Sequence, residues 1–117
     1  MTENKPTKSI GSEAEQLVAA NLKEQGHHIL VMNWKTKWCE IDIISKKDNT
    51  VFFTEVKYRK ISNWGSGLEA ITTKKLSQMK FAAELWMASQ KWTGSARLMA
   101  ASVEGQPPKL DQIIEIN

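Results

Sequence analysis

The sequence predicts a single α/β domain in which a mixed central sheet carries one helix on each side. Three patterns support this fold class. Apolar residues keep helical spacing up to Gly26, residues 38–59 have the pattern of a β-hairpin, and a second helical pattern over residues 68–91 is followed by further strands. A length of 117 residues suits one domain, and 41% hydrophobic with 25% charged residues is ordinary for a globular chain.

The first helix is expected to follow a short disordered leader. Residues 1–8 are polar and charged and contain a proline, which is typical of a disordered end. Ser9 or Ser12 is then expected to cap a helix that runs to Gln25 and ends at Gly26, because glycine readily takes the conformation that ends a helix.

One face of this helix is apolar. Its apolar residues recur at helical spacing and predict a buried stripe made of Ile10, Ala14, Leu17, Val18 and Leu22. On a helical wheel, Glu13 and Glu15 lie at opposite margins of this stripe. A carboxylate at such a margin can reach a site in the sheet, or it can turn toward water. The wheel does not decide between the two residues.

The segment HHILVMNW predicts a first strand. One cysteine and two histidines do not supply a zinc site, so His27 and His28 are expected to be ordinary turn and strand residues. Residues 33–38, NWKTKW, then lead into the hairpin. Their alternating aromatic and basic side chains could stack on nucleotides, although at least one of Trp34 and Trp38 is expected in the core.

A β-hairpin is predicted next, and the chain is organised around it. Residues 40–45 and 51–58 are rich in Ile, Val, Phe and Thr, which favour strands, and the polar residues 47–50 lie between them. We expect Asp48 and Asn49 to form the two-residue loop of the hairpin.

This register places four charged residues together. Counted back along the antiparallel ladder, Asp42 lies opposite Glu55, and Glu40 lies opposite Lys57. Strand side chains alternate between faces, so all four are expected on one side of the sheet.

Two opposed carboxylates repel each other and require compensation. A divalent cation, a shared proton or the ammonium of Lys57 could each provide it at Asp42 and Glu55. A cation such as Mg²⁺ would make this a catalytic site, in which the lysine orients or deprotonates an attacking water. The alternative is a partly buried ion-pair cluster that holds the hairpin together.

A loop and a long helix are predicted after the hairpin. The loop, residues 60–67, is rich in glycine and serine and carries Trp64, a candidate for stacking on a base or for covering the core. The helix is expected over residues 68–91, with an apolar face made of Ile71, Leu76, Met79, Ala82, Ala83, Leu85, Trp86 and Met87.

The chain is expected to end in strands. Thr93 and Gly94 break the helix, residues 95–103 predict a strand, residues 105–108 a turn, and residues 110–116 a short edge strand.

The charge distribution suggests a polyanionic partner. The formal net charge is +3, and basic residues surround the acidic cluster: Lys35, Lys37, Lys57, Arg59, Lys60, Lys74, Lys75 and Lys80. Such a rim suits the binding of nucleic acid beside a metal, although scattered lysines also serve solubility. The absence of a long apolar run or signal-peptide segment, together with a single cysteine, predicts a cytoplasmic protein without a membrane partner.

The motifs as a set resemble a known superfamily. Glu15 on the first helix, Asp42 in the second strand and Glu55-Val56-Lys57 in the third match the pattern of the PD-(D/E)xK nucleases. More narrowly, residues 11–86 resemble the YraN family, relatives of archaeal Holliday-junction resolvases, through Gly11 and Glu15, Leu22, Gly26, Asn33-Trp34-Lys35, EIDII, VFFTEVK, Arg59, Gly65 and Lys75. The chain departs from that pattern at Ala14, Cys39, Thr54 and residues 97–99.

The resemblance implies a restriction-endonuclease-like fold of order αβββαβ and a Mg²⁺- or Mn²⁺-dependent deoxyribonuclease. It implies that Asp42, Glu55 and the Val56 carbonyl bind the metal, that Lys57 positions water, and that Glu15 is the helper carboxylate. The expected partner is DNA, with branched or structured DNA as the expected substrate. From the charge distribution and the loop, its expected contacts are Lys35, Lys37, Arg59, Lys60, Trp64, Lys74 and Lys75. The resemblance also allows a homodimer. The rival hypotheses are a nucleic-acid-binding module that does not cut, and a protein-interaction module.

Overall fold

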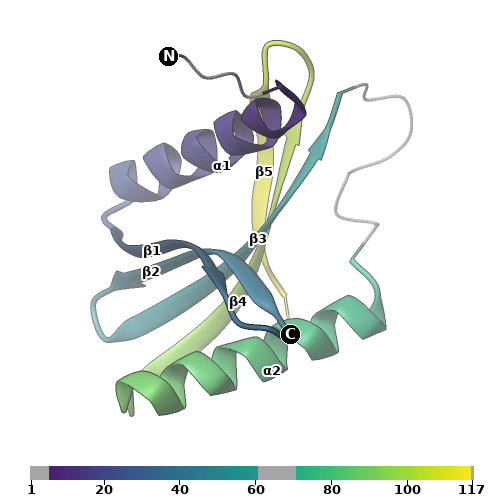
Figure 1. Ribbon diagram of the computed structural model, residues 1–117. Helices are drawn as coiled ribbons and strands as arrows, with labels where there is room; N and C mark the ends of the chain where they lie inside the picture. The colour runs from purple at the N-terminus through teal and green to yellow at the C-terminus, as the bar shows by residue number, and fades with distance from the viewer. Residues whose placement is uncertain (1–5, 61–70, 117) are drawn as a thin grey trace, which may run out of the picture.

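The structure is a computed structural model that describes residues 6–60 and 71–116, with the side chains of the first helix described from Ser12 onward. The elements follow the order helix, three strands, helix, two strands (Figure 1). They are α1 (Pro6–Glu24), β1 (His28–Lys35), β2 (Glu40–Lys47), β3 (Thr50–Arg59), α2 (Thr73–Gln90), β4 (Ser95–Glu104) and β5 (Lys109–Ile116).

One mixed sheet lies between the two helices. Its strand order is β1-β2-β3-β4-β5; β3 and β4 run parallel, and the other neighbours run antiparallel. The parallel pair follows from α2, because a crossover helix brings the chain back to the same end of the sheet before β4 begins. Figure 1 shows α1 over one face and α2 over the other. The predicted α/β class and its mixed, helix-flanked sheet are confirmed.

Two apolar clusters fix the helices to the sheet. On the α1 face, the buried residues are Ala14, Val18, Ala19, Leu22, Ile43, Ala101 and Val103. On the α2 face, they are Ile41, Ile44, Val51, Phe53, Ala82, Ala83 and Trp86. The predicted stripe of α1 is confirmed at its described residues. The edge of the Trp86 ring meets the ring of Phe53 with centroids 5.7 Å apart.

α1 begins earlier than predicted. It starts at Pro6 rather than at Ser9 or Ser12, so residues 6–8 of the expected leader are helical. Proline is compatible with the first helical turn, where its fixed φ suits the helix and its missing N–H has no partner to lose. The other end agrees with the sequence, because Gly26 follows the helix with a φ of 98°.

α2 is shorter than the sequence pattern suggested. The pattern predicted residues 68–91, but the helix runs from Thr73 to Gln90. Thr72 is extended and its Oγ1 accepts a hydrogen bond from the backbone N–H of Lys75 at 3.1 Å, so it acts as the N-cap. Lys91, with a φ of 55°, ends the helix before the predicted break at residues 93–94.

The predicted hairpin loop is confirmed, but its ladder is shorter than expected. Lys47 pairs with Thr50 across the loop, Asp48 has a φ of 55°, and the pairing continues to Ile43 and Thr54. It stops there, one pair short of Asp42 and Glu55. The strict alternation behind the one-face prediction therefore does not extend to Asp42.

The alternation of faces along β2 is broken near the point where its pairing with β3 ends. Ile41 and Ile44 pack on the α2 face, whereas Ile43 packs on the α1 face, so alternation is broken around Asp42. The neighbouring strand is irregular at the same level. Asn33 lies between the pairs Met32–Ile43 and Trp34–Ile41, opposite Asp42, and has a φ of 53°.

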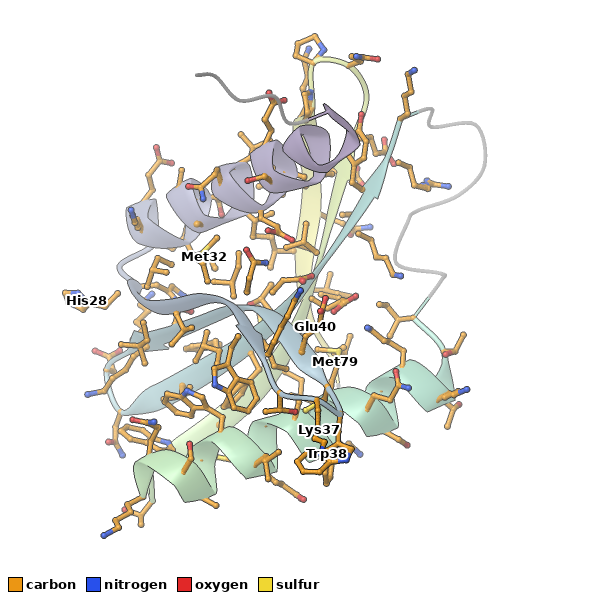
Figure 2. The ribbon with its side chains drawn as sticks, in the orientation of Figure 1. His28, Met32, Lys37, Trp38, Glu40 and Met79 are labelled. Carbon is orange, nitrogen blue, oxygen red and sulfur yellow. The ribbon has the colours of Figure 1, made fainter. Side chains whose placement is uncertain are left out.

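The two tryptophans before the hairpin have different environments. Trp34 packs against the α2-side cluster, which confirms that at least one of the pair belongs to the core. Trp38 is 70% exposed and lies near α2 (Figure 2).

His27 packs locally, as predicted. Its Nδ1 lies 2.9 Å from Ser45 Oγ, and its ring lies against Phe52. Burial, assisted by Lys47, lowers the pKa of His27. Neither described helix has the length and hydropathy needed to cross a membrane.

Candidate functional site

The candidate site lies where the pairing of β2 with β3 ends. Asp42 lies at this point and is buried, with 7% of its surface exposed. Its Oδ2 accepts a hydrogen bond from the backbone N–H of Val56 at 2.8 Å. In a continuing ladder, a main-chain carbonyl of β2 would accept this hydrogen bond. Here the Asp42 carboxylate accepts it, so the Val56 N–H has a partner although the strand pairing has ended.

Asp42 is close to other carboxylates. Burial, and after it the charge of Glu55, raise the pKa of Asp42 to about 7 against the opposing effect of the hydrogen bond from Val56. Glu15 and Glu40 add smaller contributions of the same sign. Carboxylates from α1, β2 and β3 thus all contribute to the raised pKa of Asp42.

Glu55 has a cationic partner that comes from α2. Its Oε2 lies 3.3 Å from Lys75 Nζ, and the glutamate side chain is only 9% exposed. The sequence offered a cation, a proton or Lys57 as compensation for the two carboxylates. The structure adds a fourth, Lys75, which had been predicted as a nucleic-acid contact. No pattern within the hairpin could reveal a partner that arrives from a helix twenty residues further along.

Asn33 holds the helper carboxylate. Its Nδ2 donates a hydrogen bond to Glu15 Oε1 at 2.9 Å, which connects β1 to α1 beside Asp42. The choice of Glu15 over Glu13 is consistent with this contact. Sequence reasoning missed the role of Asn33. The available signal was that asparagine tolerates a positive φ better than most residues.

Lys57 follows Glu55 by two residues on β3 and is partly exposed. It is in register with Ser102 of the parallel strand β4. Within residues 6–60 and 71–116, Ser102 Oγ is a buried hydroxyl without a hydrogen-bond partner.

Comparisons with known proteins show the family to which this chain belongs. Residues 14–113 match the family described as "Uncharacterised protein family UPF0102". This chain belongs to the UPF0102 family. The match covers the whole site and confirms the resemblance to the YraN family.

Several curated UPF0102 proteins are similar to this chain. Protein VP0448 of Vibrio parahaemolyticus is 38% identical over 84 residues, which cover 72% of this chain and 69% of that protein. Protein PA4424 of Pseudomonas aeruginosa is 34% identical over 119 aligned positions, 97% of this chain and 95% of the relative. A protein of Syntrophomonas wolfei is 37% identical over 82 residues, 70% and 71% of the two chains.

The donor set of this UPF0102 chain fits a hard divalent cation. Among the described residues, no group of three or more His, Cys, Asp and Glu side chains is placed to hold a metal ion, so a cation would depend on fewer side-chain ligands. Asp42 and Glu55 provide two buried carboxylates, and the Val56 carbonyl belongs to the same strand segment. Mg²⁺ is commonly held by one or two carboxylates and completes its octahedron with waters and phosphate oxygens. An incomplete cage of this kind therefore suits it.

The predicted basic residues are not all directed at one surface. Lys35 lies 3.9 Å from Glu40, Arg59 bonds Glu104 at 3.2 Å, and the ammonium of Lys37 lies 5.3 Å from the centroid of the Trp38 ring. Lys60 and Lys74 are exposed. Trp64 and Gly65 lie outside the described residues.

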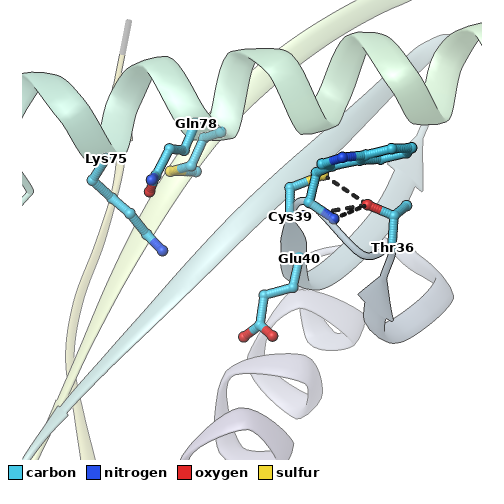
Figure 3. A pocket seen from close by; sticks show the side chains of 7 residues that line it. Thr36, Cys39, Glu40, Lys75 and Gln78 are labelled. Atoms are coloured by element: carbon cyan, nitrogen blue, oxygen red, sulfur yellow. Dashed lines mark hydrogen bonds between the residues drawn. The ribbon is translucent and has the colours of Figure 1, made fainter.

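A cavity adjoins the carboxylates. It has a volume of about 290 Å³ and lies between α2 and the connection from β1 to β2 (Figure 3). Its lining consists of Thr36, Trp38, Cys39, Glu40, Lys75, Gln78 and Met79. Sequence reasoning singled out none of Thr36, Cys39 and Gln78 for function. They come together only when α2 packs on the sheet.

Proposed function

We propose that this UPF0102 protein is a metal-dependent endonuclease that hydrolyses phosphodiester bonds of DNA. The observation that carries the proposal is the burial of Asp42 beside Glu55 at the point where two strands separate. A fold gains no stability from placing two like charges in a low-dielectric gap. The arrangement is intelligible if the pair holds a cation.

Each residue has a role that follows from its place. Asp42 and Glu55, with the Val56 carbonyl, hold Mg²⁺ or Mn²⁺, which when bound polarises a phosphoryl oxygen and lowers the pKa of water. Lys57, two residues beyond Glu55, orients the attacking water or offsets charge that develops on the phosphate. Glu15, held by Asn33, accepts a hydrogen bond from water at the rim of the site. Lys75 and the exposed lysines attract the polyanionic substrate.

Cleavage assays test this proposal. Supercoiled, linear and four-way-junction DNA are incubated with the protein in Mn²⁺, in Mg²⁺ and in EDTA. We expect cleavage only with metal, and a loss of at least about 100-fold in Asp42→Asn, Glu55→Gln and Lys57→Met, the scale expected for groups that stabilise transition-state charge.

Matched variants control for charge and fold. Asp48→Asn makes the same change in the turn of the same hairpin, and Lys109→Met removes a lysine from the exposed edge strand β5. Both are expected to cleave like the wild type. Cleavage that survives Lys57→Met and EDTA would refute the proposal, because it would not come from this site.

The ion pair at Lys75 favours a second candidate function. With Glu55 bound to the Lys75 ammonium, part of the negative charge of the acidic cluster is neutralised without any metal ion. The chain could then be a nucleic-acid-binding module that retains the fold and does not cut. Calorimetric titration with Mn²⁺ separates the two functions. Metal uptake that is lost in Glu55→Gln supports the nuclease, whereas salt-sensitive DNA binding without metal uptake supports the binding module.

A further inference from the structure

One wall of the cavity beside the carboxylates is an exposed side chain that contributes little to the stability of the fold. Trp38 forms this wall and exposes 70% of its surface, more than the other exposed large hydrophobic residues of the described chain, Leu30, Phe81 and Ile114. Figure 2 shows Trp38 and Lys37 together beside α2. An indole adds little to the stability of the fold when most of its surface stays in water.

Trp38 lies on a turn whose backbone is held by hydrogen bonds. Thr36 Oγ1 accepts hydrogen bonds from the backbone N–H groups of Trp38 at 3.1 Å and Cys39 at 3.2 Å. The Thr36 N–H donates to the Cys39 carbonyl at 2.8 Å. Because the backbone under the ring is fixed by three hydrogen bonds, the ring is presented in a defined place, and binding to it requires little further ordering.

The rest of the lining suits a flat heteroaromatic ring. Met79 is buried and contributes a thioether, and Cys39 contributes a thiol, so one side of the cavity is apolar and polarisable. Gln78 offers both a donor and an acceptor, and Glu40 offers an acceptor. A volume of about 290 Å³ is just below the roughly 300–1,000 Å³ that is typical of small-molecule sites, which suits a single flat ring.

One side chain belongs to both the cavity and the carboxylate cluster. Lys75 lines the cavity (Figure 3). Its Nζ lies 3.3 Å from Glu55 Oε2. A ligand in the cavity is therefore a direct neighbour of whatever is bound at Asp42 and Glu55. If that group is the phosphate of a nucleic-acid strand, the ring in the cavity is a base of the same strand.

We propose that this cavity binds one unstacked nucleobase of the strand that is cut at the carboxylates. The inference rests on the proposed function, because it takes the strand to lie at Asp42 and Glu55. The base stacks on Trp38, and its polar edge meets Gln78 and Glu40. A base inside a continuous duplex is held by its neighbours, so the cavity selects single strands, frayed ends and branch points, where unstacking costs least.

The test compares two strands of equal charge in EDTA, where no cleavage occurs. One is an oligonucleotide of thymidines, and the other is an abasic oligonucleotide of the same length. Their affinities are measured by fluorescence anisotropy. We expect the wild type to bind the strand with bases roughly 5- to 150-fold more tightly, the range measured for stacking one base on an aromatic side chain.

Two variants locate this preference. Trp38→Ala is expected to lose most of the preference for bases while keeping its affinity for the abasic strand. Its melting temperature should not change, because the ring is exposed. Phe81→Ala removes an exposed aromatic residue of α2 that does not line the cavity, and it should keep the preference.

The outcomes separate the two proposals. If the wild type binds both strands equally, phosphates alone carry the binding and the base site is refuted, while the nuclease proposal stands. If Trp38→Ala keeps the full preference, the bases bind elsewhere and the inference also fails. If the wild type binds neither these strands nor duplex DNA, nucleic acid is not the substrate and both proposals fall.

Discussion

At the scale of single residues, Asp42 makes a useful hydrogen bond, but keeping its carboxylate charged in this place costs free energy of folding. Its carboxylate satisfies the Val56 N–H in the gap between the strands, yet burial and Glu55 disfavour its charge. An asparagine would accept the same hydrogen bond without this cost. That the chain carries an aspartate here indicates selection for something other than stability.

The pH dependence of stability should reveal this cost. Between pH 3.8 and about 7, native Asp42 keeps a proton that the unfolded chain has lost. Stability is therefore fully present below pH 3.8 and falls as the pH rises through 7, by about 1.4 kcal/mol per unit and about 4 kcal/mol in all. We expect Asp42→Asn to be more stable than the wild type at pH 8 in EDTA and nearly equal to it at pH 4.

Urea denaturation at pH 4, 6 and 8 measures this difference. Asp48→Asn removes a carboxylate from the exposed turn and should follow the wild type at every pH. A constant offset between Asp42→Asn and the wild type from pH 4 to pH 8 would contradict the explanation.

Lys75 acts as a cation for Glu55 in the absence of metal. Lys75→Met leaves a buried carboxylate unpaired, so we expect a loss of about 1–3 kcal/mol in the free energy of unfolding, less than for a fully buried pair because Lys75 is 30% exposed. Lys74→Met changes the exposed neighbour on the same helix and is the control. Equal effects of the two substitutions, measured by urea denaturation at pH 7.5, would show that the ion pair does not matter.

At the scale of elements, counting residue pairs back from the hairpin loop predicts only part of the pairing between β2 and β3. The loop at Asp48 and Asn49 and the pairs up to Ile43–Thr54 follow from turn chemistry and alternation, and they are confirmed. The separation beyond them depends on how β1 twists at Asn33. That twist is a property of three strands and a helix packed together, which a two-strand pattern does not contain.

Asn33 has two separable roles in this element, its backbone conformation and its bond to Glu15. Asn33→Gly keeps access to a positive φ but removes the hydrogen bond, so we expect a change in stability below about 1 kcal/mol together with slower cleavage. Asn33→Ala loses both and should cost a further 1–2 kcal/mol or so.

Thermal unfolding and cleavage rates of these two variants distinguish the roles. If Asn33→Gly cleaves DNA as fast as the wild type, the bond to Glu15 has no part in the proposed reaction. If Asn33→Ala is as stable as Asn33→Gly, the positive φ imposes no measurable strain.

At the scale of the whole molecule, the candidate site lies where the layers meet. Glu15 comes from α1, Asp42 and Glu55 from the middle of the sheet, and Lys75 from α2. The identities of the first three could be predicted from the order of motifs along the chain, because the family pattern preserves that order. The ion pair of Lys75 with Glu55 and the cavity could not be predicted from the sequence, because both depend on where α2 packs.

Because the proposed ligands Asp42, Glu55 and Val56 join β2 to β3 in the middle of the sheet, metal should stabilise the folded state. With Mn²⁺ at about 100 times its Kd, we expect about 2.7 kcal/mol of added stability and a rise of about 10 °C in melting temperature. Differential scanning fluorimetry at pH 7.5 measures the rise. It should vanish in Glu55→Gln and persist in Asp48→Asn. An equal rise in Glu55→Gln would place the metal elsewhere.

Lys75 faces both Glu55 and the cavity. This position has a thermodynamic consequence. A cation that takes over Glu55 frees the ammonium to approach a bound strand, and a strand that attracts the ammonium leaves Glu55 open to the cation. Cofactor and substrate would then bind with positive cooperativity, and reciprocity requires each to raise the affinity of the other by the same factor. One lysine would thereby keep the metal weakly held until there is a strand to cut.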